Sequence, residues 1–311
     1  MNNQIVIKVE DLRKQFPVGL GVRKRLGLDG MSLQVNQGEI YGFLGPNGAG
    51  KTTTIKILTS LLRQDSGEAL IFGEPPWRPA ARKRLGFLPE SPVFYDHLTG
   101  REFLHFCGTL TGLSGAALSA RATELIGQVG LESAGDLQIR RYSKGMTQRI
   151  GIAQAIIHNP DLVILDEPMS GLDPMGRADV RDIIVKLRDQ GKTIFFSTHI
   201  IPDVEAICQR VGIVAKGKLI RVGTVRELMS EGSTGTVEIL ANNVPSTFQM
   251  AGVSESQVSE GQKLFTVAVG DSVNQTLAEL IKQGGTIVSV VPRQASLEDL
   301  VVRLLEKEEA S

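Results

Sequence analysis

The chain has 311 residues, enough for one large domain and a smaller one that each bury a core. Its 34 lysines and arginines balance 34 aspartates and glutamates, and this neutral charge argues against binding to a nucleic-acid backbone. The cysteines, Cys107 and Cys208, have neither metal-ligand spacing nor the density of a disulfide scaffold, so we expect two reduced core residues. Without a signal-peptide pattern or an apolar run of about 18 residues, the sequence predicts a cytosolic chain that reaches a membrane only through a partner.

Short apolar strands alternate with amphipathic helical stretches from residue 5 to about 222, which predicts an α/β domain with a largely parallel sheet. The pattern at 101–130 is that of two consecutive helices, so we expect a helical subdomain at about 95–160 to interrupt the sheet. The predicted strands are 5–9, 40–44, 162–165, 193–197 and 211–215.

A small, polar stretch at 229–235 suits a linker between a first domain, 1–230, and a second, 236–311. In the second domain, Asp271 or Ser272 is expected to cap a helix that ends at Gly284, and Ser296 to cap a final helix. With a short helix at 246–251, the order resembles a ferredoxin-like split βαβ unit, an α+β fold. The predicted strands are 237–239, 265–269 and 287–291.

A glycine-rich stretch, GPNGAGKTT, fits G-x-x-x-x-G-K-[ST] between a predicted strand and a predicted helix. Its glycines let backbone N–H groups point inward, Lys51 can reach the outer phosphates, and Thr52 can ligate Mg²⁺. The stretch therefore predicts a nucleotide-binding loop made of Gly45, Pro46, Asn47, Gly48, Ala49, Gly50, Lys51, Thr52 and Thr53.

The segment LVILDEP places Asp166 at the carboxyl end of a buried strand, where ligands bind in open α/β sheets. Asp166 can hold Mg²⁺ directly or through water, and Glu167 can act as general base for an attacking water. Alone, the pattern fits two solvated acids at the end of a surface strand equally well. Beside the phosphate loop, the hydrolytic interpretation is favoured.

A further segment, RYSKGMTQRIGIAQAII at 141–157, precedes these acids. Together with the phosphate loop, LDEP, SGLD at 170–173 and STH at 197–199, it makes residues 1 to about 230 resemble the nucleotide-binding subunit of an ABC transporter. The resemblance implies a Mg²⁺-dependent ATPase that binds ATP as a homodimer and drives a separate integral-membrane permease. It also implies a place on the inner face of the cell membrane, and no nucleic-acid partner is expected.

The resemblance also implies roles for single residues. Ser143 and Gly145 match the signature that binds the γ-phosphate of the opposite subunit, although Ser143 can equally be a helix cap. His199 matches the catalytic histidine that contacts the γ-phosphate, and Asp173 matches an acid at the dimer interface. Phe16 matches the aromatic residue that stacks on adenine. The segment GLGVRKRLG looks inserted after it, however, so a core phenylalanine is the alternative.

At two positions this sequence has a charged residue where the family pattern has an uncharged one. Glu90 stands where the family usually has glutamine, and its carboxylate favours a metal ligand but repels the phosphates, so hydrolysis is expected to depend more on domain closure. The signature reads YSKGM rather than LSGGQ, so that Lys144 adds a cation near the triphosphate. Both variations resemble those of exporter-type subunits, which often carry a carboxy-terminal domain.

Other interpretations stay open at this point. Phe94 and Tyr95, within 91–103, are candidates for the permease contact or else core rings. A soluble ABC-type ATPase that acts on nucleic acid or the ribosome is the alternative function, but such proteins usually carry two nucleotide-binding domains, coiled coils or a basic linker. The second domain can also serve in regulation or dimerisation, which is compatible with transport.

Overall fold

The structure is a computed structural model that describes residues 4–18, 23–232, 235–245, 248, 250, 252–259, 262–292 and 296–310. The chain divides into two compact units, Met1–Val225 and Arg226–Ser311. The division lies ahead of the linker expected at 229–235, of which residues 229–232 belong to helix α8 (Val225–Gly232). Val225 and Leu228 are three residues apart on one face of this helix and are both buried, which favours helix over linker.

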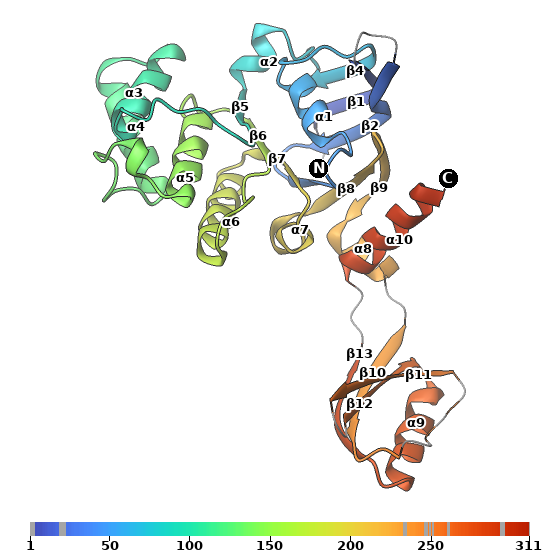
Figure 1. Cartoon of the computed structure of the whole chain (residues 1–311). Helices are drawn as coiled ribbons and strands as arrows, with labels where there is room; N and C mark the ends of the chain where they lie inside the picture. Colours follow the sequence, from blue (N-terminus) through green and yellow to red (C-terminus); the bar gives the residue numbers. More distant parts are fainter. Residues whose placement is uncertain are drawn as a thin grey trace. The chain divides into compact units, whose positions relative to one another are not determined.

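The first unit is built on a six-stranded sheet, and the α/β prediction is confirmed (Figure 1). Five strands run parallel, and the last is antiparallel to its neighbour. The central strands are buried along their whole length, as continuous apolar runs predict for a sheet covered on both faces. In spatial order the strands are β5 (Leu85–Leu88), β6 (Leu162–Asp166), β7 (Thr193–Thr198), β3 (Ile40–Leu44), β8 (Arg210–Ala215) and β9 (Lys218–Thr224).

A second, antiparallel sheet has the order β2-β1-β4, with β1 (Ile5–Val18), β2 (Arg23–Asn36) and β4 (Ser66–Ile71). The strand predicted at 5–9 is therefore too short, because β1 continues beyond Val9 and pairs with β2 as far as Val18. Helix α1 (Lys51–Leu58) follows the phosphate loop, and its Ile55 and Leu58 join a core that also contains Ile7 of β1 and Phe195 of β7. This core anchors the loop between the two sheets.

Helices α3 (Gly100–Leu110), α4 (Gly115–Gln128) and α5 (Lys144–Ala155) lie between β5 and β6 in the chain and gather at one side of the first unit (Figure 1). The consecutive helices predicted at 101–130 are thus present as α3 and α4. Helix α3 begins with a reciprocal capping box between Thr99 and Glu102. The remaining helical segments of this unit are α2 (Pro79–Lys83), η1 (Ile139–Arg141), α6 (Pro174–Asp189) and α7 (Ile201–Ile207).

The second unit contains an antiparallel sheet in the order β11-β12-β10-β13. A helix, α9, lies between β12 and β13 in the chain. The fourth strand, β11, had no specific prediction, and the short helix expected at 246–251 lies mostly outside the described residues. The elements are β10 (Thr236–Asn242), β11 (Val253–Ser259), β12 (Gln262–Ala268), α9 (Asp271–Lys282), β13 (Thr286–Pro292) and α10 (Leu297–Ala310).

The two helix starts of this unit differ in how well they were predicted. The Ser296 hydroxyl accepts a hydrogen bond from the Asp299 N–H at 3.1 Å, as the capping pattern predicts. The cap predicted at Asp271 or Ser272 is wrong, since Gly270 is the N-cap and the Ser272 hydroxyl instead donates to the Ala268 carbonyl at 2.6 Å.

Candidate functional site

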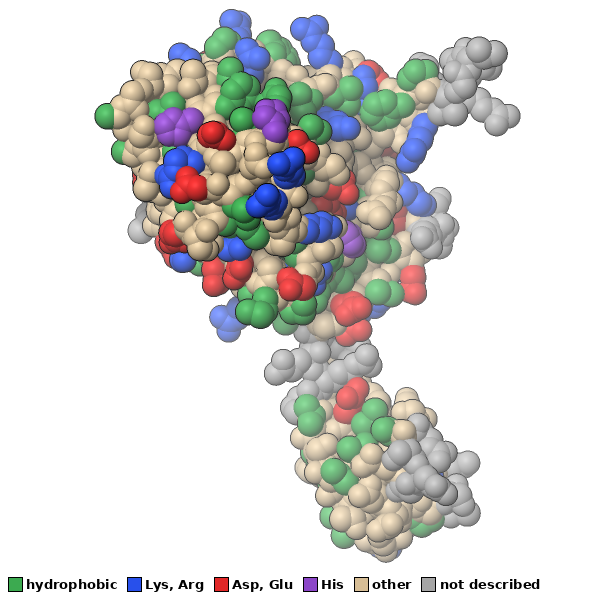
Figure 2. All heavy atoms as spheres, turned by 60° about the vertical axis from the view of Figure 1, so that its left-hand side comes forward, with side chains coloured by type: hydrophobic (Ala, Val, Ile, Leu, Met, Phe, Trp, Pro, Cys, Tyr) green, Lys and Arg blue, Asp and Glu red, His purple; other side chains and the backbone are tan. Residues whose placement is uncertain are grey.

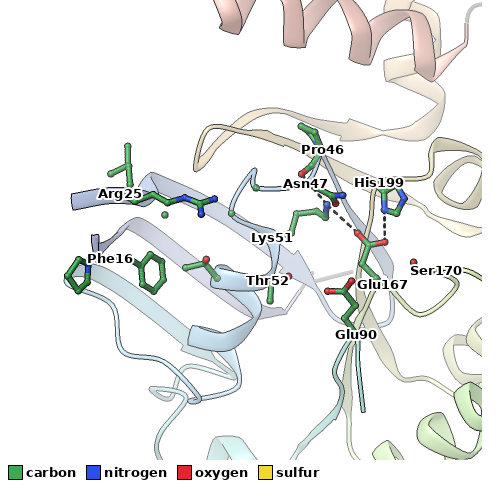
Figure 3. Close-up of a pocket in the computed structure, with 16 residues that line it drawn as sticks. Phe16, Arg25, Pro46, Asn47, Lys51, Thr52, Glu90, Glu167, Ser170 and His199 are labelled. Atoms are coloured by element: carbon green, nitrogen blue, oxygen red, sulfur yellow. Dashed lines mark hydrogen bonds and ion pairs between the residues drawn. The ribbon is translucent and has the colours of Figure 1, made fainter. Parts of the chain in front are cut away.

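A cavity of about 800 Å³ opens beside the phosphate loop (Figure 3). The loop itself, the β1–β2 hairpin and the segments after β5, β6 and β7 contribute its wall. The cavity thus lies at the carboxyl ends of parallel strands, the usual ligand position in open α/β sheets. It is lined by Phe16, Pro17, Arg25, Leu26, Gly27, Pro46, Asn47, Gly48, Gly50, Lys51, Thr52, Thr53, Glu90, Glu167, Ser170 and His199.

The phosphate loop is shaped around the Lys51 side chain. Lys51 Nζ donates to the carbonyl oxygens of Gly45 at 2.6 Å and Pro46 at 3.3 Å. Gly50 has φ +105°, in the left-handed region, and a Cβ there would lie 2.9 Å from the Gly27 carbonyl oxygen. At Gly45 a Cβ would lie 2.3 Å from the Val214 carbonyl oxygen, so this position also requires glycine. Gly45 and the buried Ala49 support the loop from behind and do not line the cavity.

Asp166 is 2% exposed at the end of β6, and its Oδ1 accepts a hydrogen bond from the Ser197 hydroxyl at 2.5 Å. Burial raises the pKa of Asp166, hydrogen bonds from Ser197 and Thr52 act in the opposite direction, and the Glu90 charge raises it further. In the described part of the chain, no group of three or more His, Cys, Asp and Glu is arranged to hold a metal by itself. The hydroxyl and carboxylate oxygens of Thr52, Asp166 and Glu90 are nevertheless the donor type of a Mg²⁺ site that is completed by phosphates and water.

Glu167 lies at the cavity wall with two partners for its carboxylate (Figure 3). Oε1 is 3.3 Å from Lys51 Nζ, and Oε2 is 2.9 Å from Nδ1 of His199. The backbone N–H of Glu167 donates to the Ser197 hydroxyl at 3.0 Å. The structure therefore brings the predicted base, the predicted histidine and the loop lysine together, although they are far apart in sequence.

Of the signature and the SGLD segment, only Ser170 lines the cavity, and Ser143, Gly145 and Asp173 lie outside its lining. Ser143 caps α5 by accepting a hydrogen bond from the Met146 N–H at 3.2 Å, and Asp173 caps α6 by accepting one from the Gly176 N–H at 2.9 Å. Gly145, in the first turn of α5, does not line it either. Lys144 lies against the SGLD segment of the same chain, since a Cβ on Gly171 would be 2.0 Å from its Nζ. Each of these residues is thus available for a site other than the cavity of its own chain.

Phe16 lines the cavity despite the insertion that follows it. The insertion contributes to the β1–β2 hairpin, in which Phe16 pairs with Arg25, while residues 19–22 lie outside the described part. The Phe16 ring packs over Gly27, where a Cβ would be 2.5 Å from a ring carbon. Sequence reasoning missed Arg25 and Leu26, which also line the cavity. Both residues belong to the insertion noted in the sequence. A prediction that this insertion forms a strand paired with the strand of Phe16 would have placed them at the cavity.

The two rings after Glu90 have different surroundings. Phe94 is partly buried against Phe103, with ring centroids 5.3 Å apart. Tyr95 is 52% exposed and contacts Phe106, which is itself 40% exposed. Figure 2, which turns the helical subdomain forward, shows apolar side chains exposed on this face. The interpretation of these rings as core residues therefore fits Phe94 but not Tyr95.

Comparison with known proteins gives a consistent family assignment. A family model described as ABC transporter matches residues 28–170. An uncharacterized ABC transporter ATP-binding protein of Nostoc sp. is 39% identical over 100% of this chain and 92% of its own length. The Nod factor export ATP-binding protein I of Cupriavidus metallidurans is 36% identical over 92% of this chain and 96% of its own. The solved ATP-binding subunit of an ABC transporter shares 30% identity and a TM-score of 0.64, over 73% of this chain and 92% of that one.

The resemblance seen in the motifs is therefore confirmed over the length of the chain, and the α/β fold of the first unit agrees with it. Lys51, Glu167 and His199 meet at the cavity in which the family's nucleotide is expected. This protein belongs to the ATP-binding proteins of ABC transporters, and such proteins are ATPases.

Proposed function

We propose that this ATPase works as a Mg²⁺-dependent homodimer that drives an exporter through a separate integral-membrane permease. The observation that carries the proposal is the position of Glu167. Its carboxylate lies at the wall of the phosphate-loop cavity, within 2.9 Å of His199 and 3.3 Å of Lys51. A carboxylate held beside a phosphate-binding loop is suited to accept a proton from water that attacks the terminal phosphate.

Each side chain has a task in this scheme. Lys51 and the inward N–H groups of the loop bind the phosphates, so that Lys51 exchanges its Glu167 partner for phosphate oxygens. Glu167 then accepts a proton from the attacking water, while His199 donates a hydrogen bond to the γ-phosphate and stabilises its developing charge. Thr52, Asp166 and Glu90 would hold Mg²⁺, which when bound neutralises phosphate charge.

A second copy of the chain completes the proposed site. Ser143 and Gly145 of that copy would bind the γ-phosphate with the N-terminal end of α5, whose first turn contains no acidic residue. Asp173, which caps α6, would lie at the interface between the copies. Ser143 and Lys144 are both exposed, which supports this arrangement because neither side chain is buried in the core of its own chain.

Export rests on the relatives. The Nod factor protein named above is called an export ATP-binding protein and matches both units of this chain. Among the helices that the structure describes, none has the length and apolar character required to cross a membrane. We propose that the chain binds a permease at the inner face of the membrane through the exposed side chains Val93, Tyr95, Phe106 and Leu110.

Affinity capture from native membranes tests the transporter assignment. Glu167→Gln protein is incubated with Mg-ATP, purified, and compared with the same protein without nucleotide and with a Val93→Ser, Tyr95→Ser variant. We expect a polytopic membrane protein that is retained by the first sample and lost with the double substitution. Recovery of only ribosomes, nucleic acid or soluble proteins would instead support the soluble ATPase.

Sedimentation of the Glu167→Gln protein tests the dimer separately. Mg-ATP is expected to convert monomer to dimer, and Ser143→Arg is expected to prevent this because its side chain would occupy the phosphate position at the α5 N-terminus. A monomer at saturating Mg-ATP would contradict the homodimer.

A further inference from the structure

The carboxyl end of β7 connects the phosphate loop to the acids Asp166 and Glu167. The Thr198 carbonyl accepts a hydrogen bond from the Gly45 N–H at 3.2 Å, which ties the strand to the phosphate loop. His199, the next residue, contacts Glu167. Ser197, the residue before, has so far no role in the proposed mechanism, yet it contacts both acids at the end of β6.

Ser197 is fully buried, with 0% exposure, and its hydroxyl makes two hydrogen bonds. It accepts from the Glu167 N–H at 3.0 Å and lies 2.5 Å from Oδ1 of Asp166. Because a backbone N–H can only donate, the hydroxyl hydrogen is free to be directed at the Asp166 carboxylate. One side chain of β7 therefore bridges the carboxylate of the last residue of β6, Asp166, and the backbone of the residue that follows it, Glu167.

The residue whose backbone Ser197 holds has an unusual conformation. Glu167 has φ +50°, in the left-handed region that non-glycine residues rarely adopt. Such conformations persist where surrounding interactions determine them, and they occur often at functional sites. In this conformation the Glu167 carboxylate is directed at Lys51 and His199, so the hydrogen bond from its N–H helps to hold the direction of the side chain.

We propose that Ser197 is a positioning residue for hydrolysis, which anchors the Glu167 backbone beside Asp166 and thereby holds the Glu167 carboxylate in place. The inference rests on the proposed role of Glu167 as the base. Ser197 does not touch the cavity, so its removal acts on the orientation of the acids and not on contacts with the nucleotide.

Thr193 on the same strand provides a matched control. It is also buried, at 1% exposure, and its hydroxyl accepts from a backbone N–H, that of Gly38, at 3.0 Å. It lies at the opposite end of β7 from the site. Ser197→Ala and Thr193→Val each remove one buried hydroxyl and are expected to lower the thermal unfolding midpoint to similar extents.

Steady-state kinetics separates positioning from loss of stability. We expect Ser197→Ala to lower kcat at saturating Mg-ATP by at least about tenfold, because a small misplacement of a catalytic group is costly, while KM and the dissociation constant for ATP measured without Mg²⁺ stay within about twofold. Thr193→Val should keep wild-type kcat. Ser197→Cys, which retains a weak donor and acceptor, should give an intermediate kcat and serves as the second variant if the alanine protein does not fold.

A double substitution identifies the route of the effect. If Ser197 acts through Glu167, then Ser197→Ala added to Glu167→Gln lowers kcat no further. Wild-type kcat in both Ser197 variants, equal losses of kcat in Ser197→Ala and Thr193→Val, or a full additional loss in the double variant would overturn the inference. Unimpaired turnover of Glu167→Gln alone would instead overturn the proposed function, so the two failures are distinguishable.

Discussion

Lys51 Nζ lies 3.3 Å from Oε1 of Glu167, and the two side chains are only 6% and 7% exposed. The lysine of the phosphate loop and the proposed base are therefore partners in the structure. Phosphates that bind Lys51 compete with Glu167 for its charge. Under the proposed function, we therefore expect ATP binding to release the Glu167 carboxylate toward its catalytic task.

Removal of one partner should destabilise the nucleotide-free protein. We expect Lys51→Met to lower the free energy of unfolding of the first unit by about 3 kcal/mol, because it leaves a buried carboxylate without its cation. Denaturant titration followed by fluorescence of Trp77, the single tryptophan, measures this. Lys56→Met, on the exposed face of the same helix, is the control and should have little effect. The double variant with Glu167→Gln should lose less than the sum of the single losses, and strict additivity would contradict the pairing.

The Glu167→Gln substitution should separate binding from turnover. Glutamine keeps the shape of the side chain but cannot accept the proton from water, so kcat should fall at least about a hundredfold. Nucleotide affinity should persist, since Lys51 and the loop N–H groups are unchanged. Phosphate release and equilibrium binding measure the two quantities. A variant that hydrolyses ATP at the wild-type rate would assign the base elsewhere.

Arg25 should contribute to nucleotide affinity. It extends from β2 toward the phosphate loop at the cavity wall (Figure 3), where its guanidinium can pair with phosphate and offset the charge of Glu90. We expect Arg25→Ala to weaken ATP binding about tenfold, as the loss of one charged hydrogen bond allows, with a smaller effect for adenosine. Arg63→Ala, an exposed position outside the cavity lining, is the control. Equal losses of affinity for ATP and adenosine would indicate that Arg25 contacts the adenine ring instead of the phosphates.

Both cysteines should be unreactive in the folded protein. Burial raises the pKa of Cys107 to about 11 and that of Cys208 well above its ordinary value. A raised pKa lowers the thiolate fraction, so at about pH 8 a disulfide reagent should label the native protein slowly and the unfolded protein rapidly at two thiols. Labelling of Cys107 should accelerate as the pH rises toward its pKa. Rapid labelling of a native thiol at about pH 8 would contradict this.

Local patterns in the sequence were sufficient for much of the first unit. Ile40–Leu44, the loop that ends at Lys51, and the strand that carries Asp166 were identified because a buried strand is an apolar run and a phosphate loop needs glycines at set intervals. The extent of β1 was underestimated because its register with β2 shifts between Val9 and Leu12, and this irregularity interrupts the period-two apolar alternation.

The sequence by itself determined the family, the α/β fold of the first unit and the identity of most candidate residues, since these depend on short motifs in a fixed order. Only the tertiary structure decided that Lys51, His199 and Ser197 all contact Glu167, and that Ser197 also contacts Asp166. It likewise decided that Arg25 joins Phe16 at the cavity. These contacts join residues on separate strands. Their geometry is set by the register of the parallel strands and by the β1–β2 hairpin. Neither can be derived from the spacing of residues along the sequence.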